Sequence, residues 1–119
     1  MKLSELKVFI VGNKKPYWGG KYFIFVKLTS DNGVIGYGEV YSASISPQAM
    51  KIVIEDVFDR HMKNESPENI ELMFRRVYSS GFSQRPDPTV IGAFSGLEMA
   101  CLDIIGKSIN KPIYSMLGG

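Results

Sequence analysis

The chain of 119 residues contains one histidine, His61, and one cysteine, Cys101, so a histidine-based or thiol-based mechanism would depend on one of them. His61 follows Arg60 at the end of a predicted helix, where the helix dipole favours a solvated imidazolium over a general base. Cys101 lies within an apolar helical pattern, with no histidine or asparagine placed to activate it, which indicates a buried and inert thiol. We therefore predict no catalytic residue in this sequence.

The carboxylates have spacings that are typical of structural roles. Glu98 and Asp103 are five residues apart on one predicted helix, so they do not share a face well. Asp103 precedes Lys107 by four residues, which predicts an ion pair, and the acidic residues between 55 and 59 predict a solvated helix face. One cysteine and one histidine exclude a multi-cysteine or histidine-rich metal site. We predict no metal ligand in this chain.

Two segments have the character of binding loops. Residues 12–20 hold the single tryptophan, Trp18, among several glycines, and they form a connection too long for a tight turn. Loops with exposed aromatic side chains often bind ligands, although Trp18 could equally cap the edge of the core. We expect this loop to be the most mobile ordered segment. Residues 41–46 are small and rich in hydroxyl groups, and alone they indicate only the approach to a helix.

The first half of the chain predicts a three-stranded antiparallel meander. Asn32 and Gly33 predict a tight hairpin in which both residues adopt positive φ. Gly36 and Gly38 remove side chains from one face of the last strand, which indicates a close neighbour across that face. Apolar and β-branched residues place the strands at 6–11, 21–29 and 34–40. The middle strand is apolar on both faces and is therefore predicted to be central.

The second half predicts three helices, each introduced by a capping residue followed by proline, at Ser46–Pro47, Ser66–Pro67 and Asp87–Pro88. The predicted ranges are 47–61, 67–80 and 88–108. The third helix is apolar almost all round and should be the buried central helix. Gly92, Gly96 and Ala100 give it a smooth stripe for close packing. The residues expected in the core are Val90, Phe94, Leu97, Cys101 and Ile104.

Length and composition restrict the class of protein. A chain of 119 residues fits one domain and is too short for a (β/α)₈ barrel of about 250 residues. A net charge of +2 without a basic cluster gives no reason to expect nucleic-acid or membrane binding. The charged start of the chain does not fit a signal peptide, so a cytoplasmic location is expected.

Three motifs, in order, resemble those of a known family. They are Gly36-Tyr37-Gly38-Glu39 on the third strand, the run from Gly96 to Lys107 (GLEMACLDIIGK), and the run from Lys111 to Gly119 (KPIYSMLGG). With their spacing they resemble the N-terminal capping domain of the enolase superfamily, in the mandelate racemase/muconate lactonizing enzyme branch. The resemblance covers residues 1–119 as one domain, with about 109–119 leading towards a barrel that this sequence lacks.

The resemblance implies an α+β fold, a three-stranded meander followed by a three-helix bundle, and a C-terminal TIM barrel as its partner domain. In the family, the barrel supplies the acidic ligands of Mg²⁺ and the lysine or histidine residues that remove the proton α to a carboxylate. The full-length protein is then expected to be a homo-oligomer acting on a small carboxylate. The 119-residue chain alone is expected to bind no Mg²⁺ and to be inactive.

The resemblance also implies that the two loops close over the barrel. Tyr17 and Trp18 in the first loop, and Tyr41 and Ser44 in the second segment, become candidate substrate-binding residues that set specificity and exclude water. The first loop and residues 81–88, with Arg85, resemble those of sugar-acid dehydratases, although Arg85 could instead lie at a subunit interface. A racemase, epimerase or cycloisomerase of the same family is the alternative, as is a stand-alone binding module.

Overall fold

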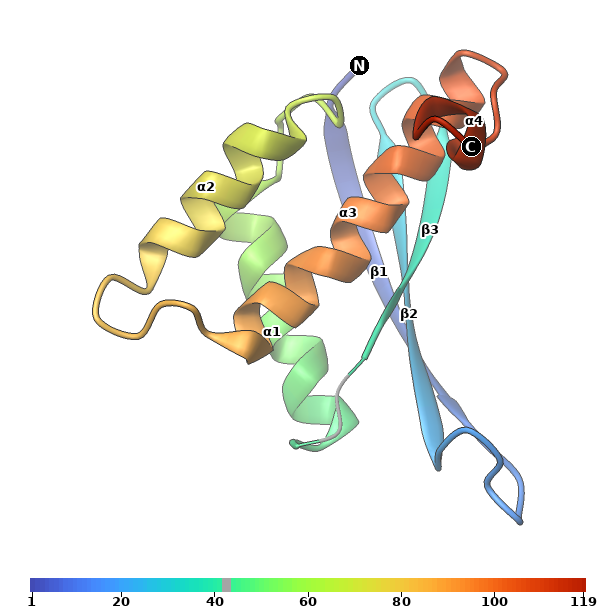
Figure 1. Ribbon diagram of the computed structural model, residues 1–119, viewed down its shortest axis with the longest axis vertical. Coiled ribbons are helices and arrows are strands. Elements are labelled where there is room, and N and C mark those ends of the chain that lie inside the picture. Colours follow the sequence, from blue (N-terminus) through green and yellow to red (C-terminus); the bar gives the residue numbers. More distant parts are fainter. Residues whose placement is uncertain (42–43) are drawn as a thin grey trace.

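The computed structural model describes residues 1–41 and 44–119 and shows an α+β fold, with a three-stranded sheet covered on one face by helices (Figure 1). This is the predicted fold class. In chain order, the elements are β1 (Leu3–Gly12), β2 (Tyr22–Ser30), β3 (Ile35–Val40), α1 (Pro47–His61), α2 (Ile70–Ser80), α3 (Pro88–Ser108) and the short α4 (Ile113–Met116).

The sheet is antiparallel in the order β1-β2-β3, which confirms that β2 is the central strand. Its inner face carries Ile24, Val26 and Leu28, all buried against the helices. The hairpin between β2 and β3 differs from its prediction, because positive φ occurs at Gly33 (+85°) and not at Asn32. The connection between β2 and β3 is therefore longer than a two-residue turn. It is held by a hydrogen bond in which the Val34 N–H donates to the side chain of Ser30 (3.0 Å).

Helix α3 lies directly on β3, so each of the two elements is the close neighbour that the glycine pattern of the other predicts. A Cβ atom placed at Gly36 would overlap the carbonyl oxygen of Ala100, and one placed at Gly38 would overlap that of Gly96. A Cβ atom at Gly96 would in turn overlap the side chain of Val40. The close approach of helix and strand therefore depends on the absence of side chains on both elements.

Helix α3 is also the central helix of the core. Phe94, Leu97, Cys101 and Ile104 are buried, while Val90 is only partly covered near the beginning of the helix. By length and composition α3 is apolar enough to cross a membrane, with a mean hydropathy of 1.5. In this fold its apolar side chains pack against the sheet and the other two long helices, which accounts for its composition.

Burial raises the pKa of the Cys101 thiol to about 12, so the group is a neutral core residue. We predict that Cys101→Ser lowers the free energy of unfolding by about 1–3 kcal/mol, because it buries a hydroxyl without an assured partner. Urea titration of the wild type, Cys101→Ser and Cys101→Ala separates the cost of polarity from the cost of lost volume. An unchanged midpoint in Cys101→Ser would show that the site is accessible to water.

Two of the three helix starts follow their prediction. Ser46 caps α1 by accepting the Ala49 N–H (3.1 Å), and Asp87 caps α3 by accepting the Thr89 N–H (3.0 Å). The predicted start of the second helix at Pro67 is wrong, since α2 begins at Ile70. Ser66 instead closes a turn, in which its carbonyl accepts the Asn69 N–H (3.0 Å), and the helix begins only after that turn.

Candidate functional site

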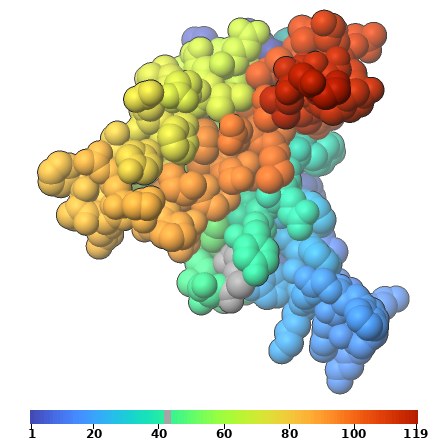
Figure 2. All heavy atoms as spheres, viewed as in Figure 1, coloured from blue at the N-terminus to red at the C-terminus, as the bar shows by residue number. Residues whose placement is uncertain are grey.

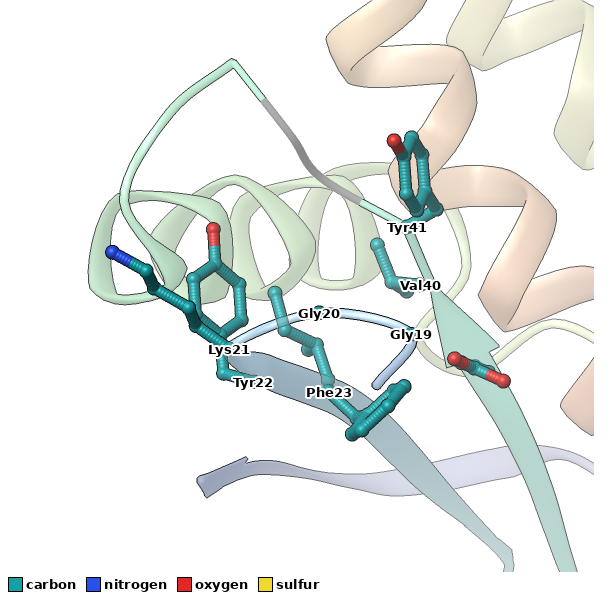
Figure 3. Close-up of a pocket in the computed structure, with 9 residues that line it drawn as sticks. Gly19, Gly20, Lys21, Tyr22, Phe23, Val40 and Tyr41 are labelled. Carbon is teal, nitrogen blue, oxygen red and sulfur yellow. The ribbon is translucent and has the colours of Figure 1, made fainter. Parts of the chain in front are cut away.

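A hollow of about 280 Å³ lies at the end of the sheet where the two predicted loops meet (Figure 3). It is formed by the end of the β1–β2 loop, the start of β2 and the end of β3. The lining residues are Gly19, Gly20, Lys21, Tyr22, Phe23, Ile24, Glu39, Val40 and Tyr41. Segments that are about twenty residues apart in sequence therefore build one surface.

The β1–β2 loop is held from within by Asn13. The side-chain amide of Asn13 donates hydrogen bonds to the carbonyls of Trp18 and Gly20, both at 2.8 Å. The chain reverses through positive φ at Tyr17, Gly19 and Gly20. These contacts fix the path by which the loop reaches the hollow, while its expected mobility stays a prediction.

Of the four predicted binding residues, the structure places Tyr41 in the wall of the hollow, with 83% of its surface exposed. Tyr17 and Trp18 lie in the adjoining loop but do not line the hollow. Trp18 is 83% exposed, so the alternative that it caps the edge of the core is wrong. Ser44 is exposed and lies outside the wall. Residues 42 and 43 of the second segment lie outside the described residues.

The hollow also contains residues that the sequence analysis did not select. Lys21 and Glu39 bring a cation and a carboxylate to its wall, and Phe23 and Val40 contribute apolar surface. The ammonium group of Lys21 lies 5.9 Å from the centre of the Tyr17 ring, which connects the loop to the hollow. Glu39 ends the Gly36-Tyr37-Gly38-Glu39 motif but was not selected as a site residue, and Lys21 belongs to no motif; the signal for both was their position beside the two loops.

Tyr22, which lines the hollow, also contacts the residues just before α1, because its hydroxyl donates a hydrogen bond to the Ile45 carbonyl (3.2 Å). The end of β2 and the second predicted segment are thereby held together. Lys21, Glu39 and Tyr41 give the lining polar groups, and among the described residues of the lining there is no pair of groups arranged for proton transfer.

The described residues do not fit a Mg²⁺ site. No group of three histidine, cysteine, aspartate or glutamate side chains gathers within residues 1–41 and 44–119. Asp103 is engaged as predicted, since its carboxylate accepts hydrogen bonds from Lys107 Nζ (2.6 Å) and from the Tyr37 N–H (2.9 Å). Magnesium needs converging oxygen ligands, which these carboxylates do not provide.

His61 differs from its prediction as a solvated cation. The ring is half-buried, and its buried Nε2 atom has no hydrogen-bond partner among the described residues. Burial lowers the pKa of His61, and the nearby Arg60 and Arg76 lower it further, although Asp56 acts in the opposite direction. His61 is therefore a neutral residue of the helix packing, and it is not near the hollow-lining residues in sequence.

This lowered pKa predicts a pH dependence of stability. Below pH 6.5 the unfolded chain binds a proton at His61 that the folded chain resists, so the unfolding free energy falls as the pH falls. The loss is complete below the folded pKa. Denaturant titrations between pH 7.5 and 5 should show this slope in the wild type and a much smaller one in His61→Gln. Equal slopes would contradict the buried, neutral assignment.

Arg85 lies away from the hollow. It stacks with Tyr78 and Phe82, at 5.7 and 5.3 Å from the ring centres, in the connection between α2 and α3. Figure 2 shows this connection on the opposite side of the molecule from the β1–β2 loop. Arg85 therefore does not join the first loop at the hollow within this chain, and its place at a subunit interface stays a prediction.

A meander backed by three long helices, with two loops meeting at one end of the sheet, is the architecture of the N-terminal domain of enolase-superfamily enzymes. Residues 18–118 match the family model described as "Mandelate racemase / muconate lactonizing enzyme, N-terminal domain". The chain therefore belongs to the mandelate racemase/muconate lactonizing enzyme family and corresponds to its N-terminal domain.

Relatives place this domain within longer proteins. A D-gluconate/D-galactonate dehydratase of Picrophilus torridus is 35% identical over 108 residues, covering 91% of this chain and 27% of the relative. A D-galactonate dehydratase of Klebsiella pneumoniae is 27% identical over 119 residues, covering 100% of this chain and 28% of the relative.

Solved structures of the family agree. A mandelate racemase/muconate lactonizing enzyme from Sulfitobacter sp. superposes with a TM-score of 0.95 at 62% identity, covering 100% of this chain and 30% of that one. The corresponding enzyme from Jannaschia sp. CCS1 has a TM-score of 0.96 at 59% identity, covering 100% of this chain and 31% of that one. The chain thus spans less than a third of the length of these relatives.

Proposed function

We propose that this chain is the capping and specificity domain of a Mg²⁺-dependent enzyme that removes the proton α to a carboxylate, with sugar-acid dehydration as its reaction. The observation that carries the proposal is the hollow, where the β1–β2 loop and the end of β3 bring Lys21, Glu39 and Tyr41 to one surface. The relatives named D-galactonate dehydratase support the choice of a sugar acid.

The metal and the acid/base groups belong, in this proposal, to a following barrel domain, since the described residues do not fit the ion. The metal would stabilise the enediolate formed on proton removal. The residues of this chain bind the part of the substrate remote from the reacting carbon. Tyr41 and Lys21 offer hydrogen bonds to hydroxyl groups, and the exposed Trp18 excludes water when the loop closes.

A racemase, epimerase or cycloisomerase of the same family is the second candidate. The apolar surface of Phe23 and Val40 in the hollow favours it, because a polyhydroxy acid needs polar partners along its length. A stand-alone binding module would instead bind its ligand without turnover.

The test uses the protein extended through the region that the relatives possess beyond this domain, together with the 119-residue chain. Both are incubated in D₂O with Mg²⁺ and a panel of aldonic, aldaric and aromatic α-hydroxy acids. We expect the extended protein to release water and form a 2-keto-3-deoxy acid, detected by NMR. Exchange of the α-proton without loss of water would support the second candidate.

The 119-residue chain is expected to show neither exchange nor tight Mg²⁺ binding by calorimetry. Turnover by this chain alone would overturn the assignment of the chemistry to the barrel. Saturable ligand binding by the chain, combined with an inactive extended protein, would favour the binding module.

A further inference from the structure

One residue, Asn13, holds the part of the β1–β2 loop that borders the hollow. Its side-chain amide donates hydrogen bonds to the carbonyl of Trp18 and to that of Gly20, both at 2.8 Å. Its backbone N–H donates to the Lys21 carbonyl at 2.9 Å. The donors of a single residue therefore meet carbonyl groups spread over residues 18–21, the last part of the loop.

The two side-chain contacts of Asn13 require an amide. Both acceptors are backbone carbonyl oxygens, so each needs a donor, and the amide carries two N–H groups on one nitrogen. An ionised aspartate of the same shape has only acceptor atoms, and its charge would face the two carbonyl oxygens. Asn13 is half-buried and its bond to Gly20 is partly shielded from solvent, which strengthens the interaction.

The backbone of the loop needs such support. The φ angle is positive at Tyr17 (+64°), Gly19 (+83°) and Gly20 (+139°). A residue with a side chain disfavours this region, and glycine adopts many other conformations as readily, so local preference does not hold the turn. Two backbone bonds of 2.9 Å assist, one from the Tyr17 N–H to the Lys14 carbonyl and one from the Gly20 N–H to the Tyr17 carbonyl. The course of the loop therefore depends on these bonds and on Asn13.

The segment held in this way carries groups that the proposed function places at the substrate. Gly20 and Lys21 belong to the lining of the hollow, and Trp18 lies in the adjoining loop. Figure 3 shows the backbone of Gly19 and Gly20 bordering the hollow. Asn13 is not one of the lining residues, so it can act on a ligand only through the residues that it holds.

We propose that Asn13 is a positioning residue, which promotes substrate binding by holding Trp18, Gly20 and Lys21 at the hollow before the substrate arrives. The inference rests on the proposed function, because it requires that the hollow receives the substrate. A loop that is ordered before binding loses less conformational freedom on binding, and this strengthens affinity. The mobility that the glycine content predicts is therefore expected in full only when Asn13 is replaced.

Nuclear magnetic resonance relaxation of the 119-residue chain tests the holding contacts. In the wild type we expect backbone order parameters of about 0.85 at residues 18–20, the value of a rigid backbone. Asn13→Asp keeps the shape of the side chain but removes its N–H donors, and it should lower these values below about 0.6. Asn13→Ala should do the same without adding a charge. Low values in the wild type, or unchanged values in both variants, would overturn the proposal.

Asn32→Asp is the matched control. Asn32 lies in the β2–β3 connection, at the opposite end of β2 from the loop, and its side-chain oxygen accepts a hydrogen bond from the Ser30 hydroxyl. Aspartate keeps this acceptor, so the order parameters at residues 18–20 and the kinetics should stay at the wild-type values. A similar loss of order at residues 18–20 in this variant would assign the effect to a general loosening of the sheet and overturn the role of Asn13.

Steady-state kinetics of the protein extended through its barrel test the effect on substrate binding. KM should rise about tenfold or more in both Asn13 variants, with a much smaller change in kcat, because the loop must then be ordered at the expense of binding. A merely structural role would reduce the fraction of active enzyme and so lower kcat at an unchanged KM. That second pattern would overturn the proposal.

The two measurements separate the failure of this inference from the failure of the proposed function. If the extended protein turns over no acid, the proposed function fails, while the order parameters still decide whether Asn13 holds the loop. If the extended protein is active and KM is unchanged in both Asn13 variants, the proposed function stands and the inference is overturned. Circular dichroism and urea midpoints near the wild-type values exclude misfolding as the cause of either change.

Discussion

Gly38→Ala is expected to lower the free energy of unfolding by about 3 kcal/mol, which corresponds to a fall in Tm of about 10 °C or more. The added methyl group would overlap the carbonyl oxygen of Gly96, and the backbone atoms of Ala100 lie close behind. Backbone cannot move aside by changing rotamer, so α3 must shift away from β3 and loosen the core around Leu97.

Gly12→Ala is the matched control, because it lies at the end of β1 with no atom within 4 Å of the added Cβ. Its effect should stay within about 1 kcal/mol in either direction. Thermal and urea unfolding of both variants make the comparison. A loss of stability at Gly38→Ala no larger than that at Gly12→Ala would show that helix and strand are not packed as closely as described.

Close packing on one face of β3 and on one face of α3 could each be predicted, because glycine spacing marks where no side chain fits, but the sequence did not show that the two faces meet. Gly36 and Gly38 alternate on one strand face, and Gly96 and Ala100 are four residues apart on one helix face. Each spacing matches the period of its element, so each pattern predicts a face without large side chains on its own element. The caps at Ser46 and Asp87 were predictable for a similar reason, since they depend on local hydrogen bonds.

The beginning of α2 could not be read in the same way. Ser66–Pro67 has the same local chemistry as the two true caps, but the turn that follows it delays the helix to Ile70. The environment of His61 depends on burial and on Arg76 from another helix, which no spacing within α1 reveals. Tertiary contacts decide both cases.

The candidate site was predictable in outline and not in detail. The two loops were identified by composition and by the family resemblance, and Tyr41 was among the residues named. Lys21 and Glu39 were missed because their importance arises from the meeting of β2 and β3 at the hollow. Ser44 was included because the family resemblance implies that the segment after the third strand closes over the barrel, although Ser44 does not line the hollow.

Tyr41→Ala is expected to lower kcat/KM about 10- to 100-fold in the protein extended through its barrel, on whichever carboxylate it turns over. The phenol is 83% exposed in this domain and stands in the wall of the hollow, so its exposed surface is available to a substrate or to the barrel face. Removing it should alter the relative kcat/KM of acids that differ in their distal groups. Mg²⁺ affinity should be unchanged, because no metal ligand is near it among the described residues.

The central claim is that the hollow faces the substrate. The most direct test compares the steady-state kinetics of Tyr41→Ala with those of Phe82→Ala. Phe82 is 81% exposed and stacks with Arg85. It belongs to the connection between α2 and α3, which Figure 2 shows on the opposite side of the molecule from the β1–β2 loop, so it matches Tyr41 in exposure and differs in position. We predict a changed substrate preference and a lower kcat/KM in Tyr41→Ala, with values near wild type in Phe82→Ala. Wild-type kinetics in Tyr41→Ala, or equal losses in both variants, would contradict the placement of the substrate at this hollow.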